Sequence, residues 1–88
     1  MAQREFTIQN KLGIHARPAA QFVKTASRFQ AEVRVEKDGE EVDGKSIMGL
    51  MMLAAGNGSI IVVSADGSDA DAALDALADL ISRKFEED

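Results

Sequence analysis

A hairpin pattern in the middle of the sequence constrains the fold more than any other feature. Residues 31–36 alternate apolar and polar side chains, which is typical of a strand with one buried face. The pair Asp38-Gly39 follows, and it is a strong signal for a tight turn between antiparallel strands. Residues 41–43 then provide a short acidic return strand, which suits a sheet edge because charge there discourages pairing with other chains. The pattern predicts an antiparallel sheet.

Further strands and helices are expected on both sides of this hairpin. Residues 5–8 alternate as a short half-buried strand, and residues 60–63 form a continuous β-branched run that is typical of an interior strand. Apolar residues recur at helical spacing from about residue 16 and again over residues 70–81. A short helix is expected between these two, over residues 47–55.

Residues at the helix ends support these boundaries. Pro18 falls in the first turn of the first helix, where its missing N–H costs nothing. Ser46 is a good N-cap for the second helix, and the Gly-Asn-Gly run at residues 56–58 is typical of its end. Ser68 is expected to cap the third helix, with an acidic residue three positions on in a variant of the capping box.

The element order is β-α-β-β-α-β-α, without an internal repeat or a linker. The order predicts an α+β fold, in which an antiparallel sheet carries its helices on one face. A ferredoxin-like arrangement shares most of this order, although the additional C-terminal helix counts against a bare version of it. At 88 residues, we expect residues 1–88 to form a single domain. We expect the acidic end of the chain, residues 85–88, to be frayed.

Charge and composition exclude several classes of function. The net charge of −5 makes the chain a poor general binder of nucleic acid or of anionic membranes. The absence of Cys excludes disulfides, a thiol nucleophile, Fe–S clusters and Cys-based zinc sites, and a single His excludes His-pair metal sites. The N-terminus lacks the apolar region of a signal peptide, and no apolar stretch could span a bilayer. We therefore expect a cytoplasmic protein that holds no metal and has no membrane insertion.

The only histidine lies at the expected start of the first helix, within residues 13–20 (GIHARPAA). The backbone N–H groups of Ala16 and Arg17 have no intrahelical partner there, and together with the helix dipole they favour an anion. The Arg17 guanidinium adds a fork that suits phosphate oxygens. A nucleophilic imidazole beside such a phosphate cradle is what a phosphohistidine site requires. A lone His near a helix start is more often only a polar loop residue, so these residues alone leave both interpretations open.

Residues 13–20 together with residues 44–50 (GKSIMGL) resemble the HPr family, the histidine-containing phosphocarriers of the bacterial phosphoenolpyruvate-dependent phosphotransferase system (PTS). The resemblance covers nearly the whole chain. It implies an open-faced β-sandwich of four antiparallel strands, in the order 1-4-2-3, with three helices on one face. It also implies that His15 accepts a phosphoryl group on Nδ1 from enzyme I and gives it to a IIA domain of a sugar permease, and that Arg17 assists. It implies no cofactor, and we expect a monomer.

Ser46 has two interpretations. As a plain N-cap it needs no further function. In HPr proteins of many bacteria, however, this serine is phosphorylated by an ATP-dependent HPr kinase/phosphorylase, and the run Lys-Ser-Ile-Met-Gly is similar to the regulated type. The resemblance therefore implies that Ser46 is a regulatory phosphorylation site and that such a kinase is a further partner.

The helix that Ser46 begins is too apolar to bury every side chain. Leu50 and Leu53 are expected in the core, whereas a flexible Met-rich patch at the surface would suit several partners. The resemblance implies that the exposed positions of this helix help to dock enzyme I and the IIA domains. The four candidates for this patch are Ile47, Met48, Met51 and Met52.

Two alternatives to a sugar-transport carrier stay open at this point. The Gly-Asn-Gly run at residues 56–58, after Leu-Ala-Ala, is somewhat like HPr-type carriers of the nitrogen-related PTS branch, which have a mainly regulatory role. A small protein-binding module without phosphoryl chemistry is an alternative of a different class.

Overall fold

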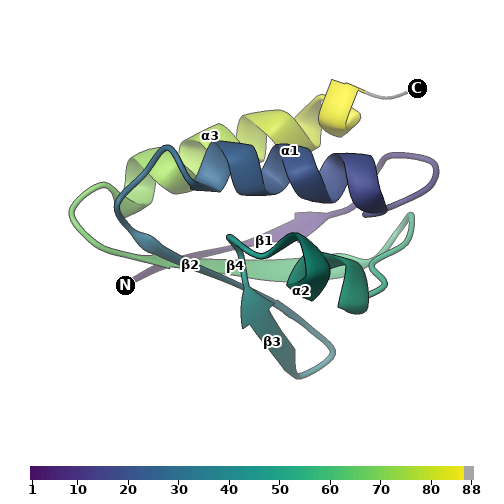
Figure 1. The fold of residues 1–88 in the computed structure, drawn as a ribbon, viewed down its shortest axis with the longest axis horizontal. Helices are drawn as coiled ribbons and strands as arrows, with labels where there is room; N and C mark the ends of the chain where they lie inside the picture. The colour runs from purple at the N-terminus through teal and green to yellow at the C-terminus, as the bar shows by residue number, and fades with distance from the viewer. Residues whose placement is uncertain (87–88) are drawn as a thin grey trace.

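A four-stranded antiparallel sheet forms one layer of the molecule, and helices α1 and α3 lie side by side across one of its faces (Figure 1). The structure is a computed structural model and describes residues 1–86. No helix in this range has the length and apolar character needed to cross a membrane. The elements in chain order are β1 (Ala2–Thr7), α1 (Ala16–Ala26), β2 (Glu32–Lys37), β3 (Glu40–Asp43), α2 (Ile47–Met52), β4 (Ile60–Asp66), α3 (Ala70–Ser82) and the short turn η1 (Lys84–Glu86).

The strand order is β1-β4-β2-β3, which confirms the predicted order and the α+β class. β4 is the interior strand that its β-branched run predicts, since it pairs with β1 on one side and β2 on the other. The Asp38-Gly39 hairpin joins β2 to β3, with Val35 opposite Val42. β1 begins earlier than expected from sequence and ends at Thr7 rather than Ile8, and β4 runs on to Asp66, because their pairing runs from Ala2 opposite Ala65 to Thr7 opposite Ile60.

The hydrophobic core lies between the helices and the inner face of the sheet. Alternation along a strand sends every second side chain to this face, and the apolar stripes of α1 and α3 cover it. The largest fully buried side chains from strands and helices are Val33, Val35, Ile61, Val63, Phe22, Leu50, Leu74 and Leu77.

The outer face of the sheet carries no helix and is acidic. Val62 on β4 lies opposite Glu5 of β1 and opposite Glu36 of β2. Glu36 in turn lies opposite Glu41 on the edge strand β3. Like charges directly opposite in a sheet disfavour pairing, so the Glu36–Glu41 pair weakens the β2–β3 hairpin.

The prediction of a frayed C-terminal segment is wrong for its first residues. Phe85 is fully buried in the core, although acidic residues follow it in the sequence. The chain reaches this position through left-handed backbone angles at Lys84, Phe85 and Glu86, with φ values of 54°, 55° and 60°. Burial of a large aromatic ring offsets the cost of this conformation. Glu87 and Asp88 lie outside the described residues.

Helix α2 ends earlier than the sequence predicts. Its last residue is Met52 rather than Ala55, and the left-handed residue that follows is Ala54 (φ 53°) rather than a glycine. Beyond the helix, the Ala55 carbonyl accepts a hydrogen bond from the Ile14 N–H (2.8 Å), which ties this segment to the loop before His15.

The N-cap of α3 is Asp69 and not Ser68, and its carboxylate makes no capping hydrogen bond. Instead, the carboxylate accepts hydrogen bonds from the backbone N–H groups of Gln30 and Ala31, both at 2.8 Å. The hydrogen bond from the Gln30 N–H is the main cause that holds the pKa of Asp69 below its ordinary value of 3.8. Burial opposes it, while the N–H groups of Ala31 and Asp69 and the charge of Lys45 also lower the pKa. The expected capping box is therefore replaced by a clamp that holds the connection between α1 and β2.

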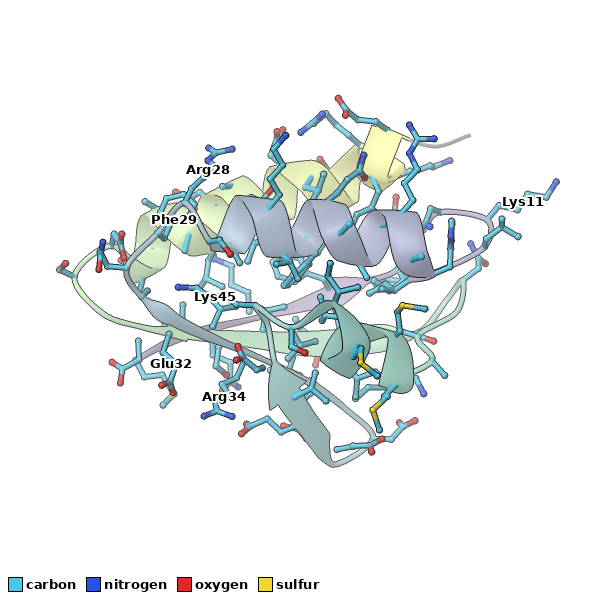
Figure 2. All side chains as sticks on the ribbon, in the orientation of Figure 1. Lys11, Arg28, Phe29, Glu32, Arg34 and Lys45 are labelled. Atoms are coloured by element: carbon cyan, nitrogen blue, oxygen red, sulfur yellow. The ribbon has the colours of Figure 1, made fainter. Side chains whose placement is uncertain are left out.

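Lys45 holds the same connection from the other side. Its Nζ donates to the Phe29 carbonyl (2.9 Å), and Figure 2 shows Lys45 directed toward Phe29 at the end of α1. A carboxylate and an ammonium group thus fix three consecutive backbone positions, residues 29–31, where the chain enters the sheet.

Candidate active site

His15 is the N-cap of α1, with extended backbone angles (φ −100°, ψ −164°). Its carbonyl accepts the hydrogen bond from the Ala19 N–H (3.0 Å) that begins the helix, whereas its side chain makes no capping hydrogen bond. The residue is half-buried. The helix therefore depends on the His15 backbone and does not require its imidazole as a cap.

The loop before His15 is held against the segment that follows α2. Besides the hydrogen bond between Ile14 and Ala55, the Asn10 side-chain amide donates to the Gly13 carbonyl (2.6 Å) inside the turn. Gly13 has φ +71°, and a Cβ there would lie 2.6 Å from the Gly56 Cα and overlap the Ala55 carbonyl oxygen. Only glycine fits this close contact between the two segments, and the contact fixes the position of His15.

The first turn of α1 presents positive charge and backbone donors. Ala16 and Arg17 are exposed, and their N–H groups belong to the first turn, where a helix offers no carbonyl partner. The Arg17 guanidinium forms no ion pair with any group in residues 1–86. Arg17 is followed along α1 by Lys24 and no acidic residue. The predicted phosphate cradle, Ala16 and Arg17, thus adjoins His15 and is open to solvent.

Ser46 is the N-cap of α2, as predicted. Its Oγ accepts a hydrogen bond from the Gly49 N–H (3.0 Å), and its carbonyl accepts one from the Leu50 N–H (3.1 Å). The side chain is half-buried rather than enclosed. The hydroxyl therefore has a structural use at this position.

Helix α2 divides into a buried and an exposed side. Leu50 and Leu53 are in the core, as predicted, while the sulfur atoms seen beside α2 in Figure 2 belong to side chains that project from the helix. We call the four exposed apolar residues the α2 patch: Ile47, Met48, Met51 and Met52. Met48 is the most exposed of them, at 74%.

One exposed apolar residue beside the candidate site is absent from the sequence-based prediction. Leu12 is 73% exposed and lies three residues before His15. The sequence offers a signal for it, since a large apolar residue between Asn10 and Gly13 is unusual in a tight turn. No group of three His, Asp or Glu side chains within residues 1–86 is arranged to hold a metal ion.

Comparisons with known proteins agree with this architecture. The family model described as "PTS HPr component phosphorylation site" matches residues 2–83. The chain is 49% identical over 87 residues to the phosphocarrier protein HPr of Cupriavidus necator, covering 99% of this chain and 98% of the relative. It is 51% identical over 88 residues to HPr of Pseudomonas aeruginosa, again covering 99% and 98%.

A solved structure is similar over its full length. The crystal structure of HPr-C-His from Thermoanaerobacter tengcongensis superimposes with a TM-score of 0.96 at 49% identity, and the match covers 100% of this chain and 99% of that one. The match in fold, together with a family model that spans most of the chain, leaves no place for the ferredoxin-like alternative. The chain belongs to the HPr family, the phosphocarrier proteins of the PTS.

Proposed function

We propose that His15 is the residue of this phosphocarrier that receives the phosphoryl group. The observation that carries the proposal is the position of His15 at the N-cap of α1, with an imidazole that makes no capping bond. A phosphoryl group on that ring lies next to the N–H groups of Ala16 and Arg17 and to the positive end of the helix dipole. Family membership implies enzyme I as the donor and a IIA domain as the acceptor.

The proposed transfer exchanges one P–N bond for another. The lone pair of His15 Nδ1 attacks the phosphorus of the phosphohistidine on enzyme I. As the new P–N bond forms, the bond to the donor nitrogen breaks and its electron pair returns to the donor imidazole. The Arg17 guanidinium and the two backbone N–H groups stabilise negative charge on the phosphoryl oxygens during the exchange. Transfer to the IIA domain repeats these events with His15 as the leaving group.

The experiment that tests this assignment is incubation with enzyme I and phosphoenolpyruvate. The wild-type protein is expected to gain one acid-labile phosphoryl group by mass spectrometry, and His15→Ala none. Circular dichroism serves as the control, because the variant should fold normally if the imidazole is not needed as a cap. Acid-labile phosphate on folded His15→Ala would contradict the assignment. Absence of phosphate on wild type would favour a protein-binding module without phosphoryl chemistry.

We also propose that phosphorylation of Ser46 regulates the loading of His15. A phosphate would add about −1.5 to −2 charges beside the α2 patch. The fold tolerates an anion at a helix start, but burying that anion against an apolar partner surface at Ile47 and Met48 would cost free energy. Docking with enzyme I should therefore weaken.

Rates of His15 phosphorylation in Ser46→Ala and Ser46→Asp test this regulation. The alanine variant should match the wild type in rate, although loss of the cap lowers its stability by about 1 kcal/mol. The aspartate variant should be slower. Equal rates for wild type, both variants and the serine-phosphorylated protein would leave Ser46 as a helix cap only.

The remaining parts of the proposal concern the setting of the reaction. The α2 patch is proposed to dock enzyme I and IIA domains, since all four of its side chains are exposed. We propose that residues 1–88 act as a single HPr domain, as a monomer and in the cytoplasm. Phosphoryl transfer to a IIA domain of a sugar permease, measured against one of the nitrogen-related branch, would distinguish the two branches of the PTS.

A further inference from the structure

We propose that Leu12 is a contact residue for enzyme I and helps to set its affinity. The proposal rests on the proposed function of His15 and adds a residue outside the α2 patch. Leu12 is 73% exposed, so the fold gains little from its apolar side chain. A single exposed Leu is ordinary on a protein surface. Two further features identify Leu12 as a docking residue: its position in a tight turn and its closeness to His15.

The turn that holds Leu12 does not require an apolar residue. The Gly13 N–H donates to the Asn10 carbonyl (3.1 Å), which places Leu12 third in a four-residue turn. Polar residues such as Asn, Asp and Ser suit such positions better, because their side chains support the turn through local hydrogen bonds. Leu12 thus satisfies neither the turn nor the core. Local conflicts of this kind are expected where a residue has a function.

The loop keeps Leu12 in a fixed position. At its start, the Ile8 N–H donates to the Ser59 carbonyl, and the Gly58 N–H donates to the Ile8 carbonyl, both at 2.8 Å. At its end, the Ile14 N–H donates to the Ala55 carbonyl. A contact residue presented by an anchored loop loses little conformational entropy when a partner covers it.

The chemistry at His15 determines what covers Leu12. A donor must bring its phosphorus into bonding contact with the His15 ring. Three residues of chain span at most about 11 Å, whereas an interface burying about 800 Å² on each partner extends about 16 Å from its centre. Leu12 therefore lies within the reach of a standard interface centred on His15, and an apolar side chain that is already held in place favours contact with enzyme I there.

Steady-state phosphorylation of Leu12→Ser by enzyme I tests the proposal. We expect KM for this protein as substrate to rise about tenfold, equivalent to about 1.4 kcal/mol, with kcat unchanged. Leu12→Met keeps a large apolar side chain, so its KM should stay within about twofold of the wild-type value. Ile60→Thr is the matched control, because Ile60 is also exposed (54%) but lies on the sheet face opposite α1, and its KM should not change.

A second readout separates docking from chemistry. Calorimetric titration of unphosphorylated enzyme I with His15→Ala, and with the same variant carrying Leu12→Ser, should show a similar loss of affinity without any phosphoryl transfer. An unchanged KM for Leu12→Ser, an equal rise in Ile60→Thr, or a fall in kcat alone would overturn the inference. Failure of wild-type protein to accept phosphate would instead contradict the assignment of His15.

Discussion

At the scale of single residues, the candidate site is positioned mainly by backbone geometry, since His15 begins α1 through its carbonyl and Ser46 begins α2. His15 and Ser46 were predictable because capping depends on a few neighbouring residues. The packing of Gly13 against the Ala55 carbonyl was not, because it joins residues far apart in the sequence. Leu12, in contrast, could have been found from its place between Asn10 and Gly13, because a large apolar residue is unusual in a tight turn.

Arg17→Lys tests whether the shape of the guanidinium matters in addition to its charge. Lysine keeps the positive charge but loses the planar fork that can donate two parallel hydrogen bonds to phosphoryl oxygens. We expect His15 phosphorylation to slow about tenfold or more, while stability changes little because Arg17 is exposed. Rapid-quench measurement of transfer from phosphorylated enzyme I provides the rate. If Arg17→Lys accepts and donates the phosphoryl group at wild-type rates, the guanidinium is not part of the mechanism.

At the scale of elements, the strand and helix types follow from the sequence pattern, whereas some ends follow from tertiary contacts. The alternation over residues 31–36 and the Asp38-Gly39 turn predict β2 and β3 because both signals are local. The segment after α2 and the Asp69 carboxylate, in contrast, contact segments distant in sequence. The first is bonded to the loop before His15, and the second to the backbone N–H groups of Gln30 and Ala31, just before β2.

Ala54→Gly should stabilise the protein. Ala54 is exposed and holds a left-handed backbone angle that disfavours any residue with a Cβ. Glycine removes this cost but is more flexible in the unfolded chain, so the net gain is about 0.5–1 kcal/mol. Urea unfolding should show a higher midpoint with an unchanged slope. A lower midpoint would mean that the Ala54 methyl group contributes packing that outweighs its strain.

Asp69→Asn should make the protein less stable at neutral pH and less sensitive to acid. Because the pKa of Asp69 is lower in the folded protein than its ordinary 3.8, the unfolded chain takes up the proton first as the pH falls. The ionised carboxylate therefore contributes its full stabilisation at a pH above the ordinary pKa. This stabilisation is lost as the pH falls through the lower pKa of the folded protein.

Urea unfolding across this pH range measures the effect. The stability difference between wild type and Asp69→Asn should be largest at neutral pH and shrink in acid. As a control, Asp71→Asn removes an exposed carboxylate of the same helix that accepts no hydrogen bond within residues 1–86, and it should show a much smaller change. A difference for Asp69→Asn that stays constant with pH would contradict the role given to the ionised carboxylate.

At the scale of the whole molecule, the core is closed by a residue that the sequence pattern does not reveal. Phe85 follows the end of α3 and precedes acidic residues, so helical periodicity cannot assign it to the core. The α+β class and the strand order, in contrast, follow from the order of elements and the family resemblance. The burial of Phe85 could not be predicted, because it arises only when the end of the chain turns back toward the core.

Phe85→Ala should be strongly destabilising. Removing a fully buried ring loses its burial and leaves a cavity, which costs about 3–5 kcal/mol. In a chain of this size each kcal/mol lowers the melting temperature by about 4–8 °C. Calorimetry should show this fall, whereas Phe85→Leu should lose less than half as much. A change of under 1 kcal/mol would show that the turn η1 is not part of the cooperative core.

The acidic row on the outer face of the sheet has a further consequence for how the molecule moves in solution. The outer face carries Glu5, Glu36 and Glu41, and α3 in the helical layer is acidic too, whereas α1 carries Arg17 and Lys24 and no acid. The exposed side of α1 is therefore a positive strip on a molecule that is otherwise anionic. In the field of an acidic surface such a molecule rotates so that its positive strip leads. The same orientation brings the start of α1, and His15 with it, toward that surface before any contact forms, and its influence on the association rate should fade as added salt screens the field.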